Sequence, residues 1–203
     1  GPDGATHQAI EDIAITRVIP NMVVIAPADA IEARKAVIAA GSYAGPVYIR
    51  VGRNKTPVAT TEQTPFTIGQ AIRVFERQPT HQVTAGIVVT GTLLANALYA
   101  AQQLNDQGVG ASVLHMPTIK PLDTDGLFEF SQEHDLVVTV EEHQRSGGLG
   151  SAVAEVLAER QPTRVLRIGI NDAFGQSGDQ EELLQHYGLD AASIARTVMT
   201  ACQ

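Results

Sequence analysis

The sequence predicts an α/β protein whose second half forms a three-layer domain around a mostly parallel sheet. Patterns typical of helices and of strands alternate along all 203 residues. Strand, helix and strand follow one another in that order, which implies parallel strand pairs joined by crossover helices. Hydrophobic residues make up 44% of the chain and charged residues 18%, so the composition supports a buried core.

The first part of the chain offers two helices and two strands. A helix is expected over 7–18, with Thr6 as its cap, because its apolar residues follow helical spacing. A strand over 22–26, a helix over 29–40 and a strand over 47–51 then form one strand–helix–strand unit. Two strands cannot build an independent core, so these elements either dock on the rest of the chain or belong to a larger domain.

A polar stretch over 53–66, with two prolines and four threonines, predicts an interdomain linker. We therefore expect one domain over 1–64 and a second over 65–203. The second domain has strand patterns at 72–75, 86–90, 111–115, 136–140 and 165–168, and helix patterns at 93–104, 125–133, 149–158, 181–186 and 191–201. This set is sufficient for a complete open α/β sheet.

Composition excludes several classes of function. The net charge of −8 argues against nucleic acid or an anionic membrane as a partner, although a locally basic site for an anionic substrate stays open. The single cysteine, Cys202, permits no disulfide framework, which fits a reducing cytoplasm. No apolar run approaches the ~20 residues of a membrane span.

The first candidate site is the stretch Asp3-Gly4-Ala5-Thr6-His7. Glycine permits a tight turn here, and the positive end of the expected helix would keep His7 neutral. A neutral imidazole can hydrogen-bond to a substrate oxygen, and Asp3 can accept a hydrogen bond from a substrate hydroxyl. The alternative is that Thr6 only caps the helix and that His7 is solvated.

The second candidate site is the pair Arg50 and Arg53, which follow the strand over 47–51. Ligands of α/β proteins bind at the carboxyl ends of parallel strands, and the guanidinium fork suits phosphate. The alternative is two surface arginines at a strand end.

A third motif, residues 141–151, reads EEHQRSGGLGS and combines a strand end, a loop and a glycine-rich helix start. It lacks the lysine of a phosphate-binding loop and the spacing of a dinucleotide fingerprint. We interpret it as a structural turn, with a subunit contact as a further possibility. The isolated histidines share no metal-ligand spacing, and no cysteine cluster indicates zinc.

Four stretches of the chain together resemble the transketolase-like thiamine diphosphate enzymes. DGATHQAIEDIAITRVIPNMVVIAPAD resembles the later half of their pyrimidine-binding domain, and GPVYIRVGRN resembles the strand and arginine turn that close it. VVTVEEHQRSGGLGSAVAEVL and IGINDAFGQSGDQEELLQHYGLD are similar to their C-terminal domain. The implied architecture is an incomplete pyrimidine-binding domain followed by a complete C-terminal domain, as in the C-terminal subunits of split bacterial transketolases.

The resemblance implies transfer of a two-carbon ketol unit from a ketose phosphate to an aldose phosphate, with thiamine diphosphate and Mg²⁺ in the complete enzyme. It implies an N-terminal transketolase subunit or domain as partner, homodimerisation, and phosphorylated sugars as ligands. By motif match, His7 would contact substrate oxygens and Asp3 a donor hydroxyl. Arg53 would bind the sugar phosphate, with Arg50 as a second phosphate ligand.

One departure from the family pattern concerns the cofactor. The family glutamate that bonds the aminopyrimidine ring lies upstream of the D-G-x-T-H motif, and Glu11 and Glu32 lie in the wrong segments to replace it. We therefore expect the chain to be part of a longer protein and, alone, to be inactive and to bind no cofactor. Two alternatives stay open: 1-deoxy-D-xylulose-5-phosphate synthase, whose arginine turn more often reads RYPRG than RVGRN, and a non-catalytic dimerisation module.

Overall fold

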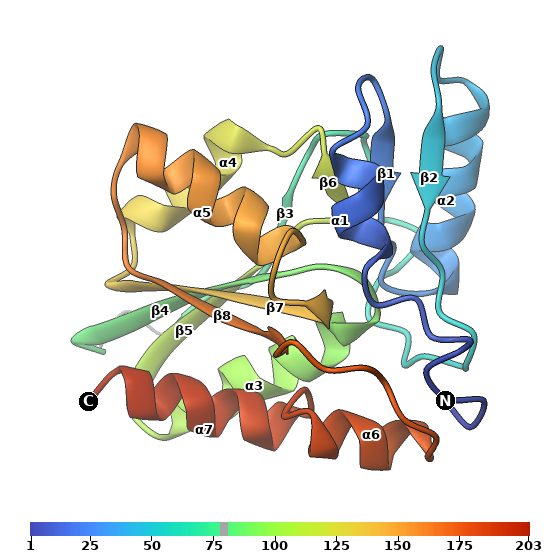
Figure 1. Cartoon of the computed structure of the whole chain (residues 1–203). Helices are drawn as coiled ribbons and strands as arrows, with labels where there is room; N and C mark the ends of the chain where they lie inside the picture. The colour runs from blue at the N-terminus through green and yellow to red at the C-terminus, as the bar shows by residue number, and fades with distance from the viewer. Residues whose placement is uncertain (78–80) are drawn as a thin grey trace.

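The computed structural model describes residues 1–77 and 81–203 and contains two sheets (Figure 1). The strands are β1 (Val23–Ile25), β2 (Val47–Ile49), β3 (Ile72–Phe75), β4 (Val83–Val89), β5 (Val109–His115), β6 (Thr118–Lys120), β7 (Leu136–Gln144) and β8 (Val165–Ile170). The α-helices are α1 (Asp12–Arg17), α2 (Ala30–Gly41), α3 (Leu94–Asp106), α4 (Thr124–Gln132), α5 (Leu149–Arg160), α6 (Gln180–His186) and α7 (Ala191–Ala201), and a 3-10 turn, η1 (Gly91–Leu93), precedes α3.

The larger sheet has the strand order β3-β5-β4-β7-β8. Its last four strands are mutually parallel, and only β3 runs antiparallel, against β5. Helices α4 and α5 cover one face and α3 and α7 the other (Figure 1). Side chains of the central strands, such as Ile87 and Val138, are fully buried between the helix layers. The predicted three-layer α/β architecture with a mostly parallel sheet is confirmed.

The smaller sheet has the order β2-β1-β6. β1 and β2 are parallel, as predicted, with Val24 opposite Tyr48. Strand β6 was not predicted, because it is three residues long and lies between Pro117 and Pro121. It pairs antiparallel with β1 and places Thr118 opposite Ile25. The first part of the chain therefore docks on the second by sharing a strand, and the boundary between 1–64 and 65–203 stays a prediction.

Helix α1 is shorter than predicted. It begins after Glu11, not at His7, so Thr6 does not cap it. The backbone before it turns at residues 5–7 and bends at residues 10 and 11. In a helix that starts at residue 7, the carbonyl of Ile10 would accept a hydrogen bond from the amide of Ala14. Here that carbonyl accepts a hydrogen bond of 2.8 Å from the amide of Gln144 on β7, and the amide of Ala14 donates to His143 instead.

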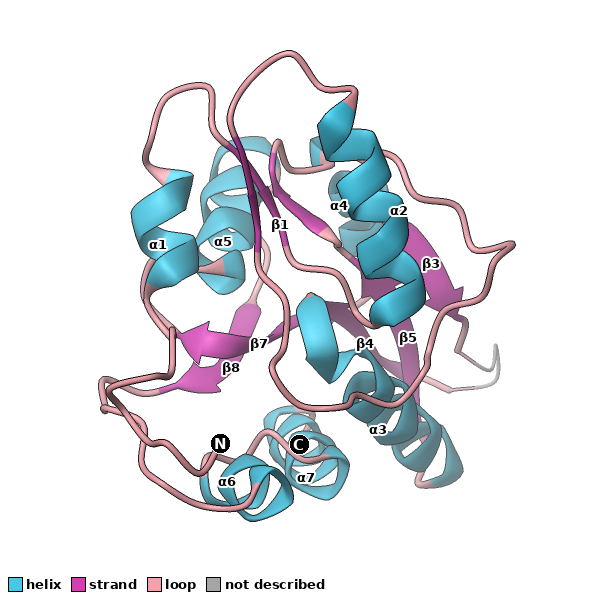
Figure 2. Cartoon of the chain, turned by 90° about the vertical axis from the view of Figure 1, so that its right-hand side faces the viewer, coloured by secondary structure: helices cyan, strands magenta, loops and turns pink. Residues whose placement is uncertain are grey.

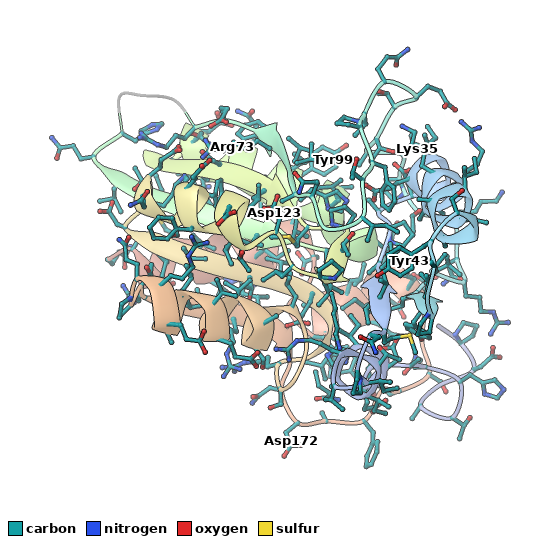
Figure 3. The ribbon with its side chains drawn as sticks, turned by 90° about the horizontal axis from the view of Figure 1, so that it is seen from above. Lys35, Tyr43, Arg73, Tyr99, Asp123 and Asp172 are labelled. Carbon is teal, nitrogen blue, oxygen red and sulfur yellow. The ribbon has the colours of Figure 1, made fainter. Side chains whose placement is uncertain are left out.

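The segment between β2 and β3 contains no helix or strand, in agreement with the predicted linker. Asp29, the N-cap of α2, accepts hydrogen bonds from linker amides as well as from its own helix. Lys35, labelled on α2 in Figure 3, donates from Nζ to the linker carbonyls of Thr61 and Thr64. The linker is therefore fastened along α2.

The remaining elements match their predicted ranges within a few residues, except that β7 continues from Val140 to Gln144. The strand pattern was predicted to end at Val140, and the residues that follow were interpreted as a strand end and a loop. Within 1–77 and 81–203, no helix has the length and apolar character needed to cross a membrane.

Candidate functional site

A cavity of about 390 Å³ brings together all four predicted site residues, Asp3, His7, Arg50 and Arg53. Its walls come from the N-terminal segment, from the end of β2 and the residues after it, from Glu142 on β7, and from α6. Figure 2 shows the N-terminal segment running beside α6. The cavity thus lies where the two halves of the chain meet, at the carboxyl ends of β2 and β7.

Asp3 and Arg53 both line the cavity and form an ion pair with one another. Both side chains stay accessible, with exposed fractions of 38% and 68%. The turn that carries Asp3 needs Gly4, whose φ of +73° is a conformation that residues with a Cβ rarely adopt. Within the part of the chain that the structure describes, Arg53 forms its ion pair with the accessible Asp3 carboxylate, so it can exchange this partner for another anion without leaving a buried charge.

His7 lies in the turn before α1, and its backbone amide donates to the carbonyl of Gly4 over 3.0 Å. Its side chain is exposed, and Nδ1 lies 2.9 Å from the Thr6 hydroxyl. Because α1 begins five residues later, the predicted influence of the helix dipole on His7 is wrong. His7 does line the cavity.

Gln8 anchors this turn to the C-terminal half of the chain. Its Nε2 donates to the carbonyl of Gln176 over 3.0 Å and to that of Gly1 over 3.2 Å. Gly175 has no side chain where Gln8 Oε1 lies, and a Cβ there would collide with it. Sequence reasoning missed this contact, because Gln8 and the segment after β8 are more than 160 residues apart.

Arg50 differs from Arg53 in both burial and partners. Only 16% of its side chain is exposed. Nε donates to both carboxylate oxygens of Asp12, over 3.2 and 3.1 Å, and Nη2 donates to the carbonyls of Ala9 and Glu142, over 2.7 and 2.8 Å. Tyr48 donates to the same Asp12 carboxylate over 2.8 Å. Burial, together with this contact, raises the pKa of Tyr48 to about 12.

The third motif forms a buried joint between β7 and α5. The Glu141 carboxylate accepts hydrogen bonds from the first amides of α5, those of Leu149 and Gly150, over 2.7 and 2.8 Å. Burial raises the pKa of this carboxyl. A Cβ at Gly148 would collide with Glu141, and one at Gly150 would lie 2.7 Å from Thr139 Oγ1. These contacts support the interpretation of a structural turn.

His143 joins the same motif to α1. The backbone amide of Ala14 donates to its Nε2 over 3.3 Å, and its Nδ1 lies 2.7 Å from the carbonyl of Gln144. An amide can only donate and a carbonyl can only accept, so the pair of contacts assigns the proton to Nδ1. The ring is fully buried, and these contacts hold α1 against β7.

No acidic side chain in the cavity is free to bond an aminopyrimidine ring, as far as the described residues extend. Asp3, Asp12 and Glu142 each face an arginine. Glu32 is buried away from the cavity, where it accepts from the amide of Ala28 and lies 2.8 Å from His115. Within the same residues, no group of three or more histidine, cysteine or acidic side chains could hold a metal ion.

Comparison with known proteins agrees with this architecture. Residues 1–58 match the family described as the transketolase pyrimidine binding domain, and residues 75–194 match the transketolase C-terminal domain. A transketolase C-terminal section from Methanocaldococcus jannaschii is 44% identical over 202 residues, which are 98% of this chain and 61% of the relative. A 1-deoxy-D-xylulose-5-phosphate synthase from Alcanivorax borkumensis is 39% identical over 98% of this chain and 30% of its own length.

Among solved structures, a split gene transketolase described as an inactive β4 tetramer superposes with a TM-score of 0.88. It is 41% identical, and the match covers 98% of this chain and 62% of that one. The chain thus spans about three fifths of the length of the split transketolases that it matches. Both domain families match in the order in which the structure carries them, and the chain belongs to the transketolase family.

Proposed function

We propose that this chain supplies the sugar-binding wall of a transketolase that moves a two-carbon ketol unit from a ketose phosphate to an aldose phosphate. The observation that carries the proposal is the convergence of Asp3, His7 and Arg53 on one open cavity. These are the residues whose motif match implied contacts with a phosphorylated sugar, and they come from two separate segments of the chain.

The ion pair between Asp3 and Arg53 gives each residue a role in binding. A sugar phosphate offers Arg53 a more highly charged partner than the Asp3 carboxylate, with oxygens that match the guanidinium fork. When Arg53 turns to the phosphate, Asp3 becomes free to accept a hydrogen bond from a donor hydroxyl. Binding of the two ends of the sugar is therefore coupled through one pair of side chains.

His7 completes the contact with the reacting end of the sugar. It is exposed in the cavity wall, so an imidazole N–H can donate to a substrate oxygen. Such a bond gains strength when negative charge builds on that oxygen in the transition state. His7 therefore contributes to turnover more than to substrate binding.

Thiamine diphosphate, when bound in the complete enzyme, supplies the electron sink for the carbanion chemistry. The cavity acids described above do not fit its aminopyrimidine ring, so no step of the reaction is assigned to them. We place the cofactor and its Mg²⁺ on parts of the enzyme outside this chain, and we expect the chain alone to bind neither.

The complete enzyme includes an N-terminal transketolase subunit or domain. The match to about three fifths of the split-gene relatives supports such a partner. Homodimerisation and a cytoplasmic location belong to the same proposal.

Product analysis tests the proposed reaction. The full-length polypeptide, with its N-terminal partner, thiamine diphosphate and Mg²⁺, is given a ketose phosphate and an aldose phosphate, and separately pyruvate and an aldose phosphate. Only in the first mixture do we expect a ketose phosphate two carbons longer than the acceptor, together with an aldose phosphate two carbons shorter than the donor. Carbon dioxide and a deoxyketose from the second mixture would identify the synthase, which the 39% identity to the Alcanivorax enzyme keeps as the second candidate.

A third outcome concerns the non-catalytic alternative. No product from either mixture, from an assembly that binds the cofactor, would contradict the transketolase proposal and favour a dimerisation module.

A further inference from the structure

We infer that Arg50 is a positioning residue, which holds the turn with Asp3 and His7 against the end of β7, and that it does not bind the sugar phosphate. This inference rests on the proposed function for the meaning of the turn. The motif match predicted Arg50 to be a second phosphate ligand. The inference gives this side chain a different role.

The donor groups of Arg50 are already directed at the protein. Of five N–H groups in a guanidinium, the one on Nε serves Asp12, and those on Nη2 serve the carbonyls of Ala9 and Glu142. The remaining nitrogen, Nη1, lies 3.8 Å from the Glu142 carboxylate. A phosphate would have to displace contacts made by a side chain that is only 16% exposed.

The charges around Arg50 also disfavour a phosphate. Asp12 and Glu142 place two carboxylates beside one guanidinium, at 3.1 and 3.8 Å. The Thr92 hydroxyl donates to Glu142 Oε2 over 3.0 Å and keeps that carboxylate in place. An incoming dianion would meet two negative groups near one positive group, whereas at Arg53 it meets one exposed carboxylate.

The contacts of Arg50 reach directly toward the functional turn. Ala9, whose carbonyl it holds, is two residues after His7, and Asp12 is the first residue of α1. Glu142 belongs to β7 of the larger sheet. The guanidinium of Arg50 thus connects the end of β2 to the N-terminal segment and to β7. These three parts of the chain lie far apart in the sequence. A lysine ammonium cannot span these partners with fixed geometry.

Kinetics of the complete enzyme separate the two roles. We compare Arg50→Met and Arg50→Lys with Arg53→Met, and use Arg34→Met as the surface control, since Arg34 on α2 is exposed and forms an ion pair with the exposed Glu62. For Arg50→Met we expect kcat to fall about 10- to 100-fold, as for a misplaced catalytic group. The loss should be equal for a phosphorylated ketose and its unphosphorylated counterpart, and Arg50→Lys should not restore it.

Hydrogen exchange of the same complete protein without substrate provides a readout that does not depend on the reaction. Backbone amides of residues 4–12 should exchange at least about tenfold faster in Arg50→Met and in Asp12→Asn, while the amides of β4 and β5 stay unchanged. Arg53→Met should leave all of them unchanged. If the protein proves to catalyse another reaction, this measurement still tests the role of Arg50.

Two results would overturn the inference. The first is a loss in Arg50→Met that is confined to phosphorylated substrates and is largely rescued by Arg50→Lys. The second is unchanged exchange over residues 4–12 in a variant whose β4 and β5 amides show that it is folded.

Discussion

Asp29 joins the start of α2 to the linker, and replacing it should cost much of the stability of the smaller sheet. Its buried carboxylate accepts hydrogen bonds from the amides of Ile31 and Glu32, from the amides of Ala59 and Thr60, and from the Thr60 hydroxyl, over 2.7 to 3.0 Å. Loss of an N-cap costs about 1 kcal/mol. The buried amide of Thr60 and the half-buried amide of Ala59, left without an acceptor, add about 1–3 kcal/mol each. Because such terms overlap, we expect Asp29→Ala to lower the free energy of unfolding by about 3–5 kcal/mol.

The pH dependence of that loss follows from the ionisation of Asp29. Burial opposes the charged form, but the hydrogen bonds from Glu32, Thr60 and Ala59 outweigh it and lower the pKa of the carboxyl. A carboxyl with a lowered pKa in the folded protein stabilises it fully above the unfolded pKa, about 3.9. This contribution is lost as the pH falls through the folded pKa, so wild type and Asp29→Asn should converge in stability in that range.

Urea unfolding of the complete protein between pH 2 and pH 7 measures both effects, because the folded pKa of Asp29 lies below its ordinary value of 3.8. Asp190→Ala is a matched control, because Asp190 caps α7 through the amide of Ser193 and its loss should cost about 1 kcal/mol. A loss in Asp29→Ala no larger than this control, or a difference between wild type and Asp29→Asn that does not change with pH, would refute the reasoning.

Three further predictions concern the cavity. Arg53→Met should lower kcat/KM for a phosphorylated ketose about 10- to 100-fold, as expected for a lost charge-assisted hydrogen bond, and equal loss for the unphosphorylated ketose would contradict it. His7→Ala should lower kcat/KM by roughly 10²–10³, with little change in KM or in the melting temperature; a large drop in melting temperature with near-normal turnover would make His7 structural. Calorimetry of this chain with thiamine diphosphate and Mg²⁺ should show no binding, and micromolar binding would refute the assignment of the cofactor to other parts of the enzyme.

Local patterns were sufficient to predict most of the fold. Helix α7 was predicted with its observed bounds, and the strands of the larger sheet were predicted within a few residues, because their apolar periodicity is also what buries them. Strand β6 escaped prediction because three residues between prolines carry no such periodicity. The end of β7 escaped because its polar residues 141–144 are stabilised by partners distant in the sequence, such as Ile10.

The four candidate residues could be selected from the sequence, but their burial and their partners could not, and their roles in binding stay predictions. Residue type and position after a strand marked Arg50 and Arg53 alike. Only the tertiary structure distinguishes them, since Arg50 is enclosed by Asp12 and Glu142 and Arg53 is not. Likewise, nothing in the local sequence around His7 shows that Ile10 pairs with β7 and delays the start of α1.

The pairing of β6 from the second half with β1 from the first half has a consequence for how the chain tolerates cleavage. Because β6 completes the sheet of β1 and β2, and Arg50 and Gln8 bind the other half directly, a peptide bond cleaved in the coil between Ile49 and Ile72 leaves every one of these contacts in place. The two pieces should remain together as a nicked protein, and separately expressed pieces should restore one another's structure when mixed. A genetic break in this coil would therefore be easier to accommodate than one between β5 and β6, because the second break would divide the strands of the larger sheet between two pieces.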